Sequence, residues 1–106
     1  MNITHEQMEV TREGIIDILA KKNGYEYNLS KASEELQELS LVLTQKLNKP
    51  YKITDQEIID EIGDVEIRLA ILRKLFNPEK VDKRIAEKLK SFKNMRNMRN
   101  LTTPKK

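Results

Sequence analysis

Four acidic residues have the spacing of two carboxylate pairs on helices. Glu35 and Glu38 are three residues apart, and so are Glu61 and Asp64. Residues three apart on a helix are neighbours on its surface, with about 5–6 Å between their Cβ atoms. If the two helices pack together, the four carboxylates repel one another, and a divalent cation removes that repulsion. These acids are therefore candidate ligands for Mg²⁺, or for Mn²⁺, which also accepts an all-oxygen site.

The position of these acids relative to the apolar residues supports a shared site. Each of the four is followed immediately by Leu, Ile or Val, so the carboxylates flank the apolar stripes of their helices. Gly63, inside the second pair, costs about 1 kcal/mol relative to Ala in a helix. It allows a ligand or another helix to come close. The pattern alone leaves two interpretations open, a metal site and an ordinary solvated acidic face.

The elements that position these acids are predicted to be four helices, at about 5–22, 29–47, 55–76 and 78–93. Only three Gly and three Pro occur in 106 residues, and 35% of the residues are charged, which favours an all-α, four-helix bundle-like fold. Apolar residues at three- and four-residue spacing predict the buried faces. In chain order the four stripes are Met8, Ile15, Ile18 and Leu19; Leu29, Ala32, Leu36, Leu39, Leu43 and Leu47; Ile58, Ile62, Val65, Leu69, Leu72 and Phe76; and Val81, Ile85, Leu89 and Phe92.

Short capping signals set the predicted helix ends. Gly24 ends the first helix, Thr54 and Glu57 form a capping box for the third, and Asn77 caps the fourth. We expect residues 1–93 to form one domain and the basic segment 94–106 to be a frayed tail. Half of the 20 Lys and Arg residues follow residue 78, against three of the 17 Asp and Glu.

The remaining composition narrows the chemistry. The chain has no cysteine and one histidine, His5, so covalent and histidine-based mechanisms have little support. One histidine also cannot supply the two E-x-x-H motifs of a di-iron bundle, and no EF-hand loop is present. Water activated by a metal and a carboxylate is the chemistry that remains.

The residues around the acids resemble a known family. The run Glu34-Glu35-x-x-Glu38 followed by Glu61-x-x-Asp64 is similar to the E-E-x-x-E and E-x-x-D signature of the all-α NTP pyrophosphatase superfamily. That superfamily includes MazG-like proteins, dimeric dUTPases and dCTP pyrophosphatases. The resemblance covers roughly residues 25–93, and the short chain is most similar to the MazG-like group.

The resemblance implies a reaction and roles for named residues. Members hydrolyse a nucleoside triphosphate between the α and β phosphates, giving a monophosphate and pyrophosphate, in nucleotide-pool house-cleaning among other roles. Glu35, Glu38, Glu61 and Asp64 match the metal ligands, and Glu34 and Glu38 are the candidate catalytic residues, with Glu34 orienting or deprotonating water. Phosphates also need positive groups, and the candidates are Lys31, Arg84, Lys88, Lys90 and Lys93, each of which is otherwise a solvated side chain.

The sequence also predicts partners and location. Apolar residues outside the main stripes, such as Ile16 and Ile67, and the family resemblance indicate a homo-oligomer, a dimer or a tetramer. The N-terminal residues lack the pattern of a signal peptide, and no run approaches the ~20 apolar residues of a membrane span, so we expect a cytoplasmic protein.

Two other functions are compatible with the sequence. The basic C-terminal segment suits a small helical nucleic-acid-binding protein, although neither a recognition helix nor an aromatic stacking platform is evident. A protein of this fold that has lost activity and acts as an interaction module is the third interpretation, against which the intact ligand positions argue.

Overall fold

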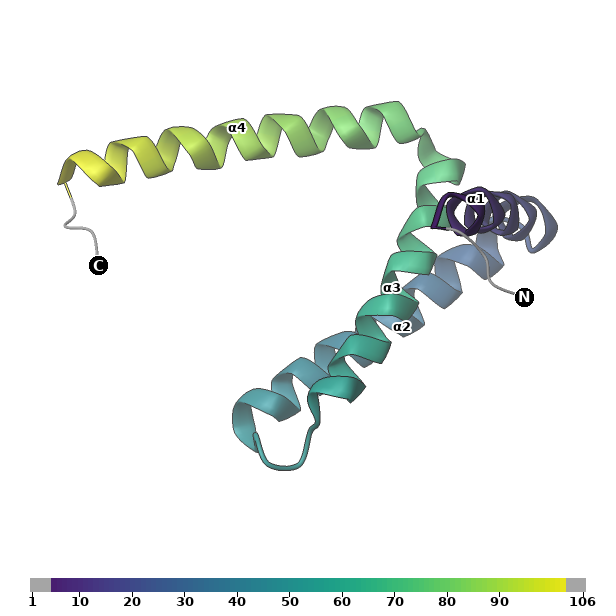
Figure 1. The fold of residues 1–106 in the computed structure, drawn as a ribbon, viewed down its shortest axis with the longest axis horizontal. Helices are drawn as coiled ribbons and strands as arrows, with labels where there is room; N and C mark the ends of the chain where they lie inside the picture. Colours follow the sequence, from purple (N-terminus) through teal and green to yellow (C-terminus); the bar gives the residue numbers. More distant parts are fainter. Residues whose placement is uncertain (1–4, 103–106) are drawn as a thin grey trace. The chain divides into compact units, whose positions relative to one another are not determined.

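The computed structural model describes the backbone of residues 5–102 and the side chains of residues 11–95. It contains four helices, and no strand occurs in the described range (Figure 1). They are α1 (His5–Lys22), α2 (Tyr25–Asn48), α3 (Asp55–Phe76) and α4 (Pro78–Thr102). The predicted all-α, four-helix fold class is confirmed. The chain divides into two compact units, Met1–Leu75 and Phe76–Lys106, and each is described by itself.

The helix α2 begins at Tyr25, four residues before the predicted start. Gly24 has a φ of 80° and a ψ of 169°, a conformation that is essentially restricted to glycine. The turn it makes is sharp enough for α2 to follow α1 almost directly, and the N–H of Asn28 donates to the carbonyl of Gly24 at 3.2 Å. The apolar stripe begins only at Leu29, which is why periodicity placed the start too late.

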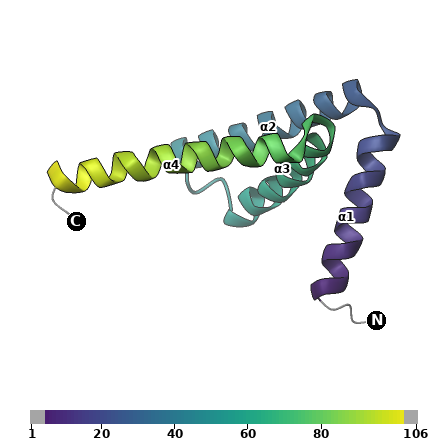
Figure 2. The same cartoon turned by 90° about the horizontal axis from the view of Figure 1, so that it is seen from above.

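The helices α2 and α3 run antiparallel and side by side, joined by a short link, as Figures 1 and 2 show. The predicted capping box at the start of α3 is confirmed. The Thr54 N–H donates to Glu57 Oε2 at 2.9 Å, and the Glu57 N–H donates to Thr54 Oγ1 at 3.1 Å. On the other side of the link, Lys46 Nζ donates to the carbonyl of Ile53 at 2.7 Å. These bonds fix where α3 starts relative to the end of α2.

A small core holds α1 against α3. The buried residues are Ile16, Ala20 and Ile71, with Leu19, Ala70 and Leu75 packed against them. The predicted buried face of the first helix was therefore wrong in part, because Ile15 and Ile18 are 51% and 60% exposed. The side chain of Met8 lies outside the described range. Ile16 and Ala20 are also four residues apart, so the same periodicity describes two adjacent stripes, and contact with α3 selects between them.

Two further contacts attach α1 to the rest of its unit. Asn28 on α2 is almost wholly buried, and its Nδ2 donates to the carbonyl of Leu19 at 3.5 Å. Lys74 on α3 forms ion pairs with Glu13 at 3.3 Å and Asp17 at 3.2 Å. We call Lys74, Glu13 and Asp17 the lysine cluster.

The helix α4 begins as predicted and ends later than predicted. The Lys80 N–H donates to Asn77 Oδ1 at 3.2 Å, and Pro78 occupies the first helical position. The helix continues to Thr102, beyond the predicted end at about 93, while 103–106 lie outside the described residues. The frayed tail at 94–106 stays a prediction. Arg and Met have good helix propensity, which a missing apolar face does not remove.

Much of the predicted apolar surface is not buried in this chain. On α2 and α3, Leu36, Leu43, Ile62 and Leu69 are each more than 40% exposed, and on α4 so are Ile85, Leu89 and Phe92. In the described part of the chain, none of the helices is long and apolar enough to cross a membrane.

Candidate metal centre

Three of the four predicted metal ligands converge between α2 and α3. One carboxylate oxygen from each of Glu35, Glu38 and Glu61 lies within 4.8 Å of the other two. Glu35 and Glu38 are neighbours on the surface of α2, and Glu61 belongs to α3. We call Glu35, Glu38 and Glu61 the acidic trio. Its convergence follows from the three-residue spacing on α2 and from the short link that brings α3 alongside.

Two oxygens of the acidic trio are buried without a hydrogen-bond partner. They are Oε2 of Glu35 and Oε2 of Glu61, and no described residue donates to either. A carboxylate on an ordinary helix surface keeps these oxygens in water, whereas a buried oxygen without a donor is costly. The trio therefore differs from a solvated acidic face.

The surroundings raise the pKa of both inward-facing acids. For Glu35 the main cause is desolvation, followed by the charges of Glu38 and Asp64, a hydrogen bond shared with the Glu38 carboxyl and the charge of Glu34. For Glu61 desolvation is again the main cause, followed by Asp64, Glu35 and Asp60. Both pKa values rise because the ionised forms lack compensation. A divalent cation supplies that compensation, so the donor set fits one.

Asp64, the fourth predicted ligand, lies beside the acidic trio. Its carboxylate is exposed, but its charge raises the pKa of both Glu35 and Glu61. Asp64 and Glu35 line a small cavity of about 140 Å³ together with Ile67 and Arg68. The charge of Asp64 would therefore also be felt by a cation bound to the trio.

Glu34 and Lys31 form a pair of their own on α2. Lys31 Nζ lies 3.3 Å from Glu34 Oε2 and 6.0 Å from the ring centre of Tyr27. Glu34 is exposed and is not a member of the trio. The structure therefore brings neither residue to the converging oxygens in this conformation, and the catalytic role of Glu34 stays a prediction.

The other predicted phosphate-binding residues belong to the second unit. Arg84, Lys88, Lys90 and Lys93 are all exposed on α4. Lys88 Nζ lies 5.4 Å from the ring centre of Phe92. Their part in phosphate binding stays a prediction.

Gly63 does not provide a close approach to any described residue. A Cβ built at Gly63 meets no heavy atom within 4 Å, so the expected helix contact is absent in the described part of the chain. Gly63 instead lines a mostly apolar groove of about 460 Å³. The groove lies between α1 and α3 and is lined by Arg12, Ile15, Ile16, Leu19, Gly63, Glu66 and Ile67.

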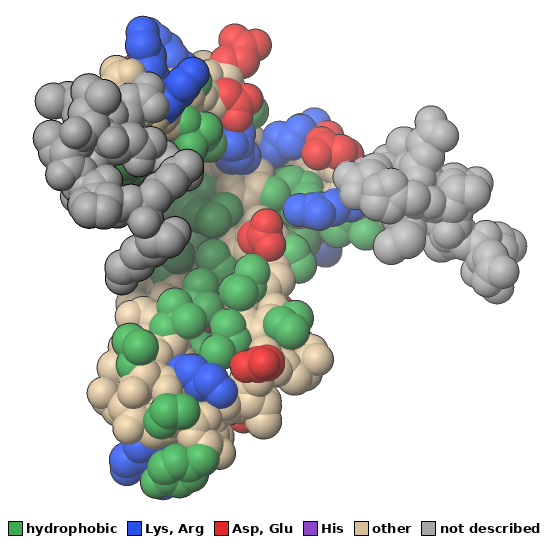
Figure 3. Space-filling view, turned by 60° about the vertical axis from the view of Figure 1, so that its left-hand side comes forward, with side chains coloured by type: hydrophobic (Ala, Val, Ile, Leu, Met, Phe, Trp, Pro, Cys, Tyr) green, Lys and Arg blue, Asp and Glu red, His purple; other side chains and the backbone are tan. Residues whose placement is uncertain are grey.

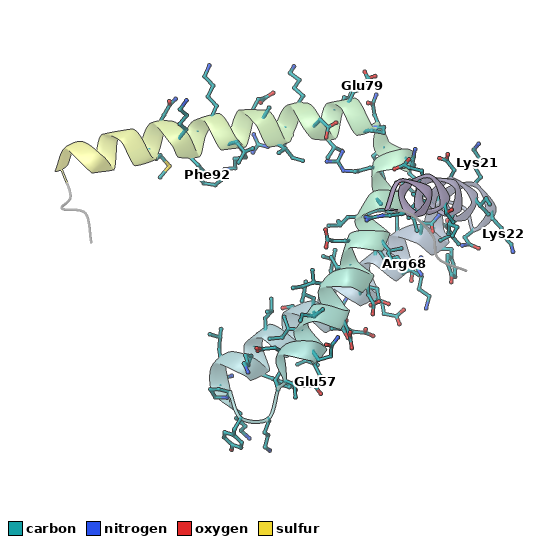
Figure 4. All side chains as sticks on the ribbon, in the orientation of Figure 1. Lys21, Lys22, Glu57, Arg68, Glu79 and Phe92 are labelled. Carbon is teal, nitrogen blue, oxygen red and sulfur yellow. The ribbon has the colours of Figure 1, made fainter. Side chains whose placement is uncertain are left out.

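Arg68 is a site residue that the sequence analysis missed. It projects from the middle of α3 (Figure 4) and lines the same cavity as Glu35 and Asp64. Its Nη1 is buried and has no hydrogen-bond partner in the described structure. The available signal was its spacing, four residues after Asp64 and seven after Glu61, which places all three on one face of α3.

Comparisons with known proteins add no identification. The sequence matches no protein-family model, and searches of curated proteins and of solved structures found no match.

Proposed function

We propose that this chain is a Mg²⁺-dependent nucleoside triphosphate pyrophosphohydrolase. The observation that carries the proposal is the convergence of Glu35, Glu38 and Glu61, two of which have buried oxygens without donors. These acids occupy the positions of the signature that the sequence resembles. Mn²⁺ suits the same oxygen ligands. The reaction takes place in the cytoplasm and serves nucleotide-pool house-cleaning.

The residues divide the work of hydrolysis between them. Glu35 and Glu61 would hold the cation, and Asp64 would complete the negative side of the site. Bound Mg²⁺ supplies a Lewis acid that neutralises phosphate oxygens and lowers the pKa of a water molecule. Glu38, the most exposed member of the trio, and Glu34 are the carboxylates available to accept the proton as water adds across the α–β anhydride bond. The products are a nucleoside monophosphate and pyrophosphate.

The test is a panel of NTPs and dNTPs assayed for pyrophosphate release with and without Mg²⁺. We expect a monophosphate and pyrophosphate as products, with activity lost in EDTA and in Glu38→Gln. Glu26→Gln is the matched control, because Glu26 is an exposed acid on the same helix, away from the trio. Release of single phosphates, or activity indifferent to EDTA and to Glu38→Gln, contradicts the proposal.

The enzyme acts as a homo-oligomer, a dimer or a tetramer. Figure 3 shows hydrophobic side chains gathered on one face of the α2–α3 pair, and large apolar residues of α1 are exposed as well. A chain that left them all in water would expose an unusually large apolar surface for a monomer. Sedimentation at tens of micromolar checks this, and a monomer at that concentration contradicts it. The exposed residues concerned include Ile15, Ile18, Leu36, Leu43, Ile62, Ile67 and Leu69.

A further inference from the structure

Arg68 brings a positive charge into an acidic site without forming an ion pair there. The side chain lines the cavity that Glu35 and Asp64 also line. An arginine four residues after an aspartate is well placed for a helix-surface ion pair. The described structure contains no such pair for Arg68, and its Nη1 is buried without any acceptor.

Unpaired groups of both signs therefore occur around one cavity, which Glu35 and Arg68 both line, and Glu61 lies beside Glu35 in the trio. The Oε2 atoms of Glu35 and Glu61 lack donors, and the Nη1 of Arg68 lacks an acceptor. The guanidinium is a cation with a planar fork of N–H donors, each of which needs an acceptor. A ligand of this site must satisfy both kinds of group.

A simple ion satisfies only one of them. A cation alone neutralises the carboxylates but repels the guanidinium, and an anion alone binds Arg68 but is repelled by the acidic trio. A divalent cation carrying an oxyanion meets both needs. Among oxyanions, a phosphoryl group presents several oxygens in the geometry that suits the fork of an arginine.

We propose that Arg68 is a phosphate-binding residue of the metal centre, which contacts a phosphoryl group of the metal-bound substrate and of pyrophosphate. This inference rests on the proposed function and adds the group that recognises phosphate. It also assigns phosphate recognition to α3, whereas Lys31, a candidate from the sequence on α2, forms an ion pair with Glu34. Phosphate binding at this site therefore requires the metal.

The test separates metal binding from phosphate binding. Binding of Mn²⁺ alone is followed by electron paramagnetic resonance. Binding of Mg-pyrophosphate is measured by calorimetric titration into protein in excess Mg²⁺, because the excess prevents pyrophosphate from removing the bound metal. The proteins are the wild type, Arg68→Gln, Arg68→Lys and the control Arg12→Gln. Arg12 is an exposed arginine that lines the apolar groove instead of the acidic cavity. Circular dichroism establishes that each variant is folded.

We expect Arg68→Gln to bind Mn²⁺ as tightly as the wild type or more tightly, because a positive charge has left the site. Its affinity for Mg-pyrophosphate should fall at least about tenfold, as expected for loss of a charge-assisted hydrogen bond. Arg68→Lys keeps the charge but lacks the planar fork, so its affinity for Mg-pyrophosphate should lie between those of the wild type and Arg68→Gln. It provides the same test if Arg68→Gln does not fold. Arg12→Gln should bind both ligands normally.

The outcomes distinguish the two proposals. Normal Mn²⁺ binding with unchanged pyrophosphate affinity in both Arg68 variants overturns the role of Arg68 and leaves the metal centre standing. Equal losses of Mn²⁺ and pyrophosphate binding also overturn it, because Arg68 would then only hold the acids in position. A wild type that binds no Mn²⁺ overturns both the metal centre and the role of Arg68.

Discussion

The α1–α3 unit contains two charged clusters that join α3 to another helix, and they differ in how their charges are met. In the lysine cluster, Lys74 Nζ lies 3.3 Å from Glu13 Oε2 and 3.2 Å from Asp17 Oδ1. The hydrogen bond to Asp17 is the largest cause of a raised pKa at Lys74, and the hydrogen bond to Glu13 is the next. The negative charges of both acids add to the effect, so the charged form of Lys74 is favoured. The acidic trio instead brings three charges of one sign together.

The difference indicates what each cluster does. The lysine cluster has its counter-charges within the chain and is partly exposed. It therefore orients α1 on α3 but adds little to the stability of the fold. The acidic trio opposes the packing of α2 on α3 unless something outside the chain compensates it. Charges left uncompensated by the fold are a feature of functional sites, and this supports the proposed metal centre.

Hydrolysis gives the largest expected difference between the clusters. Glu61→Gln removes a ligand oxygen and its charge from the trio, so we expect kcat/KM for the preferred triphosphate to fall at least about 100-fold, a loss typical of a group that stabilises the transition state. Glu13→Gln makes the same chemical change in the lysine cluster and should leave kcat/KM within about twofold. Pyrophosphate release under excess Mg²⁺ measures both, and similar losses in the two variants would remove the functional distinction between the clusters.

Divalent cations should also distinguish the two clusters by their effect on stability. A ligand that binds only the folded state stabilises it by about 2.7 kcal/mol at 100 times its Kd, so Mg²⁺ or Mn²⁺ should raise Tm by several degrees. Glu35→Gln should lose most of this rise, whereas Asp17→Asn should keep it. Differential scanning calorimetry with and without the metal measures the shift. A rise that persists in Glu35→Gln would place the stabilising ion elsewhere.

The acidic trio was predictable from sequence because its geometry is local. The spacing of Glu35 and Glu38 on one helix makes them neighbours wherever the helix packs, and the capping box at Thr54 and Glu57 sets where α3 begins. Because the link between α2 and α3 is short, the two helices are expected to pack antiparallel. Helix ends with explicit capping signals were predictable for the same reason.

Features that depend on contacts between helices were not predictable. The choice of Ile16 over Ile15 as the buried residue of α1 is made by the surface of α3, and both satisfy helical periodicity. Arg68 was missed because sequence alone cannot distinguish a surface ion pair with Asp64 from a buried donor without a partner. Asn28 lies four residues before the buried Ala32, so its position fits helical periodicity, but a pattern of apolar residues does not include its polar side chain.

Without metal, the acidic trio should destabilise the protein at neutral pH. The pKa of Glu35 is raised above its ordinary value of 4.5, so ionisation costs more in the folded state than in the unfolded state. The cost is present above the raised pKa and disappears below 4.5. Metal-free Glu35→Gln should therefore have a higher urea midpoint than the wild type near pH 8.

That gain in Glu35→Gln should shrink as the pH falls through the raised pKa and vanish when the wild-type carboxyl is protonated. Urea unfolding in EDTA across this range measures it, with Glu26→Gln as the control for loss of an exposed acid from α2. A glutamine variant that is less stable than the wild type near pH 8 would mean that the trio is compensated within the chain.

The lysine cluster should show the smallest effect and the opposite sign. Lys74→Met removes the counter-charge of Glu13 and Asp17, so the wild type should be slightly more stable than the variant near pH 8. Because the ion pairs are partly exposed, the difference in Tm should be a few degrees at most. The pKa of Lys74 is raised above 10.5, so this advantage is complete below that pH and is lost as the pH rises through the raised pKa. Urea midpoints of the two proteins should converge as the pH rises through the raised pKa. A stability difference that stays constant as the pH rises above 10.5 would show that Lys74 acts through its aliphatic chain, and the contrast with the trio would then rest on packing instead of charge.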